Sequence, residues 1–125
     1  MMTPEQVYFI AFGLYKGGKY SDALGMFRLL SRISPDNYRY IMGYAACLQL
    51  LKKYNPAITN YLKCSKLDPL SPIPPIHIAE CYLALNDNDM MIKYLNQAKM
   101  IALKDKKFEN LINQLSLWEA SHARP

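Results

Sequence analysis

The most constraining feature of this sequence is an internal repeat with a period of about 34 residues. Pro35 recurs as Pro69, and small, aromatic and aliphatic residues recur at the same offset. The matched sets are Ala11, Ala45 and Ala79; Leu14, Leu48 and Tyr82; Tyr20 and Tyr54; Ala23 and Ala57; and Phe27, Tyr61 and Leu95. A unit of this length buries its apolar side only by stacking on the next unit, so the period predicts a solenoid.

The first unit has the pattern of a helical hairpin. Thr3-Pro-Glu-Gln6 is a capping box with proline at the first helical position, and its helix is expected to run to about Lys16. Gly17-Gly18 breaks this helix, and Tyr20 to Arg32 resumes a helical pattern. Ser34-Pro35-Asp36 then ends the second helix, because proline removes an amide donor. Since the repeat predicts the same helical hairpin in each unit, we predict an all-α fold.

The helix expected over Tyr38 to Leu50 has two usable faces. One stripe follows the i, i+3, i+4, i+7 spacing of a buried helical face and contains Ile41, Tyr44, Ala45 and Leu48. A second stripe is mixed where an ordinary surface helix would carry Lys and Glu, and it contains Arg39, Met42, Ala46 and Gln49. This second stripe predicts a functional surface beside the core.

The third unit begins at a proline-rich segment, Ser71-Pro-Ile-Pro-Pro75. Ser71 is expected to cap the helix, and Pro72, Pro74 and Pro75 suit a first turn whose amides have no partner within the helix. The helix should run to about Leu85, with a turn at Asn86-Asp-Asn-Asp89 and a second helix to about Leu103. A final helix from Asp105 should cap the open end of the solenoid with Phe108, Leu111, Ile112, Leu115 and Trp118, and residues 121–125 are expected to fray.

Length, charge and cysteine usage limit the class of protein. A chain of 125 residues is one domain that needs no disulfide or metal. Cys47, Cys64 and Cys81 lie in apolar periodic segments and are expected to be buried and unpaired. The absence of an apolar run of about 18 residues and of a signal peptide at Met1 to Glu5 favours a cytosolic protein. The net charge of +5 comes from lysines along helix faces, which disfavours nucleic-acid binding and leaves an acidic partner open.

A catalytic or metal-binding role is the weaker interpretation of the polar residues in the third unit. His77 and Glu80, with Cys81 beside them, would suit a metal site or an activated nucleophile. Cys81 is not on the face of Glu80, however, and its repeat equivalent Cys47 is in a core position. Gly17-Gly18 lacks the spacing of a phosphate loop. We therefore expect no catalytic residue, metal or cofactor, and the chain is not expected to be an enzyme.

The recurring residues resemble the tetratricopeptide repeat, whose pattern has a small residue late in the first helix, Ala early in the second, an aromatic residue four positions later and a closing Pro. Leu14 to Ala23 is close to the turn of that family. The third unit departs from it, since Met91 replaces the Ala, Asn88 the turn aromatic and Leu103 the Pro. The resemblance implies a right-handed superhelix of three repeats at about 4–36, 37–70 and 71–104, with a capping helix at about 105–121.

The first helices of such a stack line its concave surface. Here the first helix already has a core stripe of Val7, Ile10, Ala11 and Leu14, so its other aromatic residues form a second apolar side. A helix that is apolar on two sides either packs against the protein on both sides or uses one side to bind a ligand. For Tyr15 and Leu83 taken singly, burial in the core remains the alternative. The predicted peptide-binding groove consists of Tyr8, Phe12, Tyr15, Arg39, Met42, Ala46, Gln49, Ile73, Ile76, His77, Glu80 and Leu83.

Two segments carry a narrower resemblance. Tyr40-Ile-Met-Gly-Tyr-Ala-Ala46 and Pro74-Pro-Ile-His-Ile-Ala-Glu-Cys-Tyr-Leu83 resemble signature segments of the class II chaperones of type III secretion in Gram-negative bacteria. Those proteins hold hydrophobic translocator proteins in the cytosol before export. The resemblance implies a groove for an extended translocator segment with spaced Pro and Leu anchors, and no insertion into a membrane. Family members usually use a preceding helical segment for homodimerisation. Because this sequence starts at the repeat, the question of whether it forms a homodimer stays open.

Two other classes of function remain as alternatives. A generic tetratricopeptide adaptor would clamp an acidic C-terminal peptide through Lys or Arg, but Arg39 is the one basic residue of the predicted groove. Raising the salt concentration separates the two, because an electrostatic clamp weakens sharply and an apolar groove hardly does. Binding of RNA or DNA by the lysine-rich convex side would be tested by a gel shift at low salt.

Overall fold

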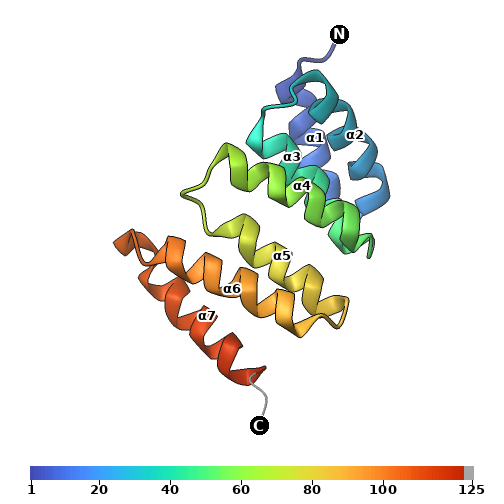
Figure 1. Ribbon diagram of the computed structural model, residues 1–125. Coiled ribbons are helices and arrows are strands. Elements are labelled where there is room, and N and C mark those ends of the chain that lie inside the picture. The colour runs from blue at the N-terminus through green and yellow to red at the C-terminus, as the bar shows by residue number, and fades with distance from the viewer. Residues whose placement is uncertain (123–125) are drawn as a thin grey trace.

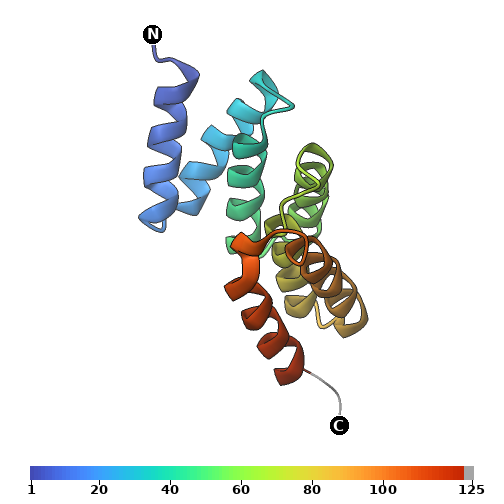
Figure 2. The ribbon, with the colours of Figure 1, turned by 90° about the vertical axis from the view of Figure 1, so that its left-hand side faces the viewer.

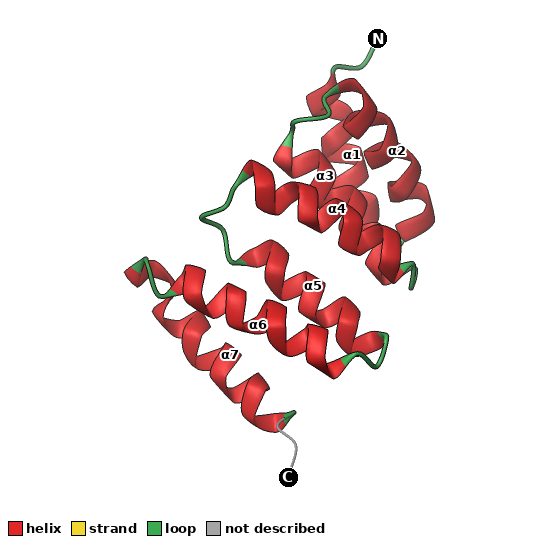
Figure 3. Cartoon of the chain, viewed as in Figure 1, coloured by secondary structure: helices red, strands yellow, loops and turns green. Residues whose placement is uncertain are grey.

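The computed structural model describes residues 1–122, and helices account for most of that range (Figure 3). The hairpins stack in sequence order, with α1 and α7 at opposite ends (Figure 1). The view turned by 90° shows the same elongated stack from its side (Figure 2). The all-α prediction is confirmed. The helices are α1 (Pro4–Lys16), α2 (Tyr20–Ile33), α3 (Tyr38–Leu50), α4 (Tyr54–Leu67), α5 (Ile73–Ala84), α6 (Asn88–Ala102) and α7 (Glu109–Ser121), with a 3-10 turn η1 (Lys106–Phe108) before α7.

The period of the sequence is visible in the backbone of the three hairpin turns. In each turn an amide donates to the carbonyl oxygen five residues earlier, over 2.8, 2.8 and 2.9 Å; the pairs are Lys19 to Leu14, Lys53 to Leu48 and Asp87 to Tyr82. The residue before each of these amides is in the left-handed region, with φ of 81° at Gly18, 63° at Lys52 and 60° at Asn86. The first turn has the glycine that this geometry favours and the third has an asparagine, which tolerates it, so Lys52 is the residue held in a strained backbone.

The core is a row of three clusters, and each cluster joins a hairpin to the first helix of the next unit. The first cluster includes Phe27, the second Tyr61 and the third Leu95, all at most 1% exposed. Ala11, Ala45 and Ala79 are fully buried in the same clusters. The interpretation of these repeat positions as packing residues is confirmed. Each hairpin buries a large side chain against the helix that follows it, as expected for a solenoid.

The ends of the stack differ from the sequence-based expectation. Ile10 was expected in the core but is 43% exposed, because α1 is the outermost helix and contacts α2 and α3 on its other sides. The final helix does not begin at Asp105. The Asp105 carboxylate instead accepts a hydrogen bond from the Lys107 amide at 3.1 Å and starts the short turn η1. Leu115 is buried against α6, and the part of the fraying prediction that covers 123–125 lies outside the described residues.

The proline-rich start of the third unit is only partly as predicted. Helix α5 begins at Ile73, and Pro72 occupies the capping position in place of Ser71. The Ser71 hydroxyl oxygen accepts hydrogen bonds from the Ile73 amide and from the Tyr38 hydroxyl, both at 3.3 Å. Pro74 and Pro75 lie in the first turn as expected, and both are buried. This arrangement ties the start of α5 to the start of α3.

The close approach of α2 and α3 depends on the missing side chain of Gly43. A Cβ atom at this position would lie 2.3 Å from the Phe27 ring. We expect Gly43→Ala to lower the free energy of unfolding by about 1–3 kcal/mol, since overpacking forces the ring to move. Urea denaturation measures this change.

Gly25 provides a matched control, because it is also helical and a Cβ there would meet nothing within 4 Å. Gly25→Ala should raise the free energy of unfolding by about 0.5–1 kcal/mol through helix propensity. Equal effects of the two substitutions would contradict the role assigned to Gly43.

Candidate functional site

A hollow of about 370 Å³ opens on the surface that α1, α3 and α5 form together. Its walls are mainly aromatic and aliphatic. The lining residues are Tyr8, Phe12 and Tyr15 from α1; Phe27 from α2; Tyr38, Arg39, Met42, Gly43 and Ala46 from α3; and Ile73 and His77 from α5. We call this surface the groove. Three separate hairpins contribute to it, so the groove exists only in the stacked fold.

A ladder of aromatic rings forms the α1 wall of the groove. The Tyr8 and Phe12 rings stack with centres 6.1 Å apart, and the Phe12 and Tyr15 rings with centres 6.3 Å apart. The i, i+4, i+7 spacing of these residues places the rings along one side of the helix. The Arg39 guanidinium lies 4.5 Å from the centre of the Tyr8 ring. Such a wall offers apolar area with little loss of side-chain freedom when a ligand covers it.

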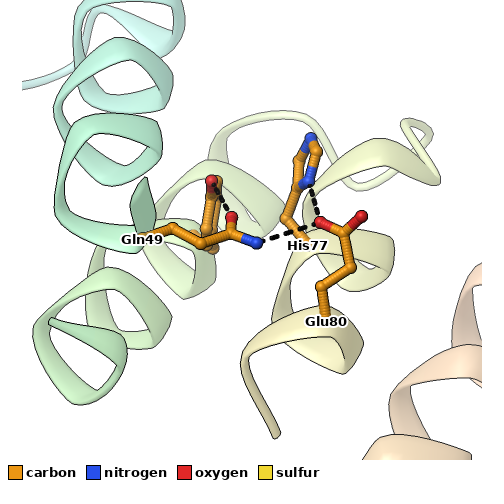
Figure 4. Close-up of polar contacts among 4 residues, drawn as sticks. Gln49, His77 and Glu80 are labelled. Carbon is orange, nitrogen blue, oxygen red and sulfur yellow. Dashed lines mark hydrogen bonds and ion pairs between the residues drawn. The ribbon is translucent and has the colours of Figure 1, made fainter. Parts of the chain in front are cut away.

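The other end of the groove is polar and organised by one carboxylate (Figure 4). Glu80 Oε1 lies 2.6 Å from His77 Nδ1 and accepts a hydrogen bond from Gln49 Nε2 at 3.1 Å. Gln49 Oε1 in turn accepts a hydrogen bond from the hydroxyl of the buried Tyr61 at 2.7 Å. The His77 ring stacks on the Tyr61 ring at 5.2 Å. The network joins α3, α4 and α5 and holds the polar end in one geometry.

These contacts set the protonation of the network. Partial burial alone would raise the pKa of Glu80, but the hydrogen bonds from His77 and Gln49 and the charge of His77 lower that pKa below its usual value. Burial raises the pKa of the Tyr61 phenol far above its usual range, so Tyr61 remains a hydrogen-bond donor. The groove therefore carries a carboxylate at neutral pH.

Most of the predicted groove residues come together, and two do not. Tyr8, Phe12, Tyr15, Arg39, Met42, Ala46, Ile73 and His77 line the hollow, while Gln49 and Glu80 extend it through the network. Ile76 and Leu83 instead pack against the cluster around Ala79 and Leu95, which corrects the expectation that they face the groove. They share a helical stripe with Ala79, whereas Ile73, His77 and Glu80 lie on a different stripe of α5.

The sequence analysis missed three residues that line the groove, namely Phe27, Tyr38 and Gly43. Tyr38 precedes Met42 and Ala46 at steps of four residues, so its spacing was a usable signal. Phe27 belongs to α2 and reaches the groove where Gly43 leaves space. No local pattern predicts that contact, because it depends on how closely two helices approach.

A second hollow of about 370 Å³ lies between α2, α3 and α4. It is lined by Arg28, Ser31, Arg32, Pro35, Ile41, Tyr44, Asn60 and Lys63. The wall is mostly polar and basic and lacks the ladder of stacked rings that the groove has. An acidic partner for the lysine-bearing helix faces stays an untested alternative, and the groove is the candidate site.

The cysteines are placed for packing rather than for chemistry. Burial raises the pKa of the Cys47 thiol to about 11 and those of the Cys64 and Cys81 thiols to about 12. A reactive cysteine needs the opposite shift. Within residues 1–122, no group of three His, Cys, Asp or Glu side chains is placed to hold a metal ion. In the same range no helix is long and apolar enough to cross a membrane.

The thiols should be unreactive in the folded protein. At pH 8 we expect all three cysteines to react with a thiol reagent far more slowly in buffer than in urea, because they are buried and protonated. Colorimetric thiol titration before and after unfolding measures the difference. Rapid modification of any cysteine in the folded state would contradict this assignment.

The Glu80 network should be visible in a pH titration. The lowered pKa means that Glu80 stabilises the fold at pH values above its ordinary range, and this contribution is lost as the pH falls through the lowered pKa. Gln49→Met removes one donor and should move the pKa of Glu80 upward. The side-chain carboxyl carbon signal in NMR measures the midpoint in both proteins. A midpoint that does not respond to Gln49→Met would show that the hydrogen bond does not form in solution.

Three comparisons place the fold and the groove among known proteins. A family model for the tetratricopeptide repeat matches residues 4–37 and 40–63. Low calcium response locus protein H of Yersinia pestis is 38% identical over 81 residues, which are 65% of this chain and 48% of that protein. The chain therefore spans about half the length of this relative.

Solved structures match over almost the whole chain. The type III secretion translocator chaperone SycD of Yersinia enterocolitica, in complex with a peptide of the translocator YopD, is 31% identical with a TM-score of 0.83, covering 90% of this chain and 86% of SycD. PcrH, which is known from Pseudomonas aeruginosa, in complex with the chaperone binding region of PopB, is 32% identical with a TM-score of 0.84. That match covers 91% of this chain and 92% of PcrH.

Proposed function

This chain belongs to the family of type III secretion translocator chaperones, and on that premise we propose that it binds hydrophobic translocator proteins of such a system. Binding would keep these clients soluble in the bacterial cytosol and competent for export. The observation that carries the proposal is the aromatic groove, an exposed apolar surface that a stable monomer has no structural reason to keep. Phe12, for example, remains 44% exposed in the middle of its ladder.

The shape of the groove suits an extended segment with spaced anchors. A preformed hollow of about 370 Å³ admits a few side chains of the size of Leu or Pro, with the ring ladder beside them. Each anchor contributes about 1.5–3 kcal/mol when fully buried. The ordering of a disordered segment opposes this gain, so the net affinity is moderate. Moderate affinity suits a chaperone that later releases its client.

The chemistry of the site favours holding over catalysis. The thiol beside the network, Cys81, is kept protonated at neutral pH because burial and the nearby Glu80 charge raise its pKa. His77 and Glu80 interact with each other, with Gln49 and with the Tyr61 ring, which is a structural use of both side chains. We therefore assign the chain a binding role and no reaction. The complexes of SycD and PcrH with translocator segments support the same role.

The proposal is tested by changing the middle of the ring ladder. Phe12→Asp should weaken binding at least tenfold, because about 1.4 kcal/mol corresponds to a factor of ten and a lost aromatic contact costs at least this much. Suitable probes are the YopD peptide and the chaperone binding regions of PopB and PopD, which bind relatives of this chain. Isothermal titration calorimetry gives the dissociation constants, and circular dichroism confirms that the variant is folded.

Phe9→Asp is the matched control, because Phe9 is on the same helix, is 81% exposed and does not line the groove. It should bind like the wild type. Equal binding by Phe12→Asp and the wild type would rule out the groove as the site. Failure of the wild type to bind any of the translocator segments would overturn the proposed function itself.

A further inference from the structure

The Glu80 carboxylate uses only one of its two oxygens within the described part of the protein. Oε1 is in contact with both His77 Nδ1 and Gln49 Nε2, at 2.6 and 3.1 Å. Figure 4 shows the second oxygen directed away from these two donors. The Glu80 side chain is 42% exposed, so water solvates this oxygen while the groove is empty.

The surrounding donors are committed and cannot turn to the second oxygen. The hydroxyl of Tyr61 donates to Gln49 Oε1, which fixes the orientation of the Gln49 amide and directs its Nε2 to Glu80. His77 Nδ1 lies against the first carboxylate oxygen, so this ring nitrogen is also committed. The polar end of the groove therefore offers the second carboxylate oxygen as an acceptor to a ligand.

The cations near the groove are engaged elsewhere. The Arg39 guanidinium lies over the Tyr8 ring at 4.5 Å, and the Lys16 ammonium lies over the Phe12 ring at 5.5 Å. Among the described residues, the ion pair that includes Glu80 is the one with His77. An extended segment that covers α5 would remove water from the free oxygen. His77 and Gln49 contact the first oxygen alone, so a donor from the segment itself is needed to compensate the desolvated second oxygen.

We propose that Glu80 pairs with a lysine or arginine side chain of the bound segment, placed beside the apolar anchors that fill the groove. His77, Gln49 and Tyr61 act as positioning residues, since they hold the carboxylate with one oxygen free. The pairing selects cation-bearing segments over segments that have the same anchors and a neutral or acidic residue at that position. This inference rests on the proposed function and names the chemistry of the ligand that the groove takes.

A double-mutant cycle tests the pairing. The protein variant is Glu80→Gln, and the probes are the translocator segments that the wild type binds, each with one Lys or Arg at a time replaced by Gln. Glu80→Gln should weaken binding of the unmodified segment about tenfold. It should leave unchanged the affinity for the one segment variant that lacks the paired cation, because the interaction is then already absent.

The design separates a specific pair from a structural effect. The side-chain amide that Glu80→Gln introduces still has an oxygen that accepts the hydrogen bonds of His77 and Gln49, so the variant keeps the network and should fold. Glu109→Gln, on the exposed start of α7 outside the groove, is the matched control and should change no affinity. If Glu80→Gln has no effect, or weakens all segment variants equally, the pairing is wrong while the proposed function stands. If the wild type binds none of the segments, both proposals are overturned.

Discussion

The structure depends on a single kind of contact, in which one large side chain of each hairpin is buried against the helix that follows the hairpin. Phe27, Tyr61 and Leu95 occupy this position and are almost completely inaccessible to water. Between the first two units the approach is close enough for the Phe27 ring to occupy the space beside Gly43. Successive helices pack on one another along the whole stack, from α1 to α7. The groove inherits its shape from these contacts, since its walls belong to three different hairpins.

The same constraint explains why the first helices have two apolar sides. One side of α1 packs on α2 through Ala11, and a second side carries the ring ladder, which packs partly on α3 and remains partly open. The inner part of the ladder also packs on the core, since the Tyr8 ring contacts the Phe27 and Tyr40 rings. The second side adds apolar surface that water contacts in the unbound protein, which is unfavourable unless a ligand covers it. The fold thus provides the rigid frame on which an exposed aromatic wall can be kept in place.

Sequence reasoning succeeded where the information is local or periodic. The capping box at Thr3, the end of α1 at Lys16 and the buried repeat positions follow from spacing alone. It failed where the result depends on the rotation of one helix against another. The partial burial of Ile76 and Leu83 is set by which stripe of α5 turns towards α6, and the sequence places an isoleucine on each of the two stripes. The left-handed backbone at Lys52 was not predicted either, because this residue type disfavours it. The one signal in the sequence is that Lys52 is the repeat equivalent of Gly18.

The network at Glu80 was also outside the range of sequence reasoning, since it connects Gln49, Tyr61 and Glu80 on three helices. Its value to a binding groove follows from the difference between apolar and charged burial. The ring ladder attracts any apolar surface, and it gives affinity without selectivity. A carboxylate beside it makes the covering of the groove unfavourable for any surface that brings no donor, including the apolar side of another folded protein. Affinity and selectivity are therefore provided by separate ends of the same surface, and the polar end limits unspecific association while the aromatic end stays open to its client.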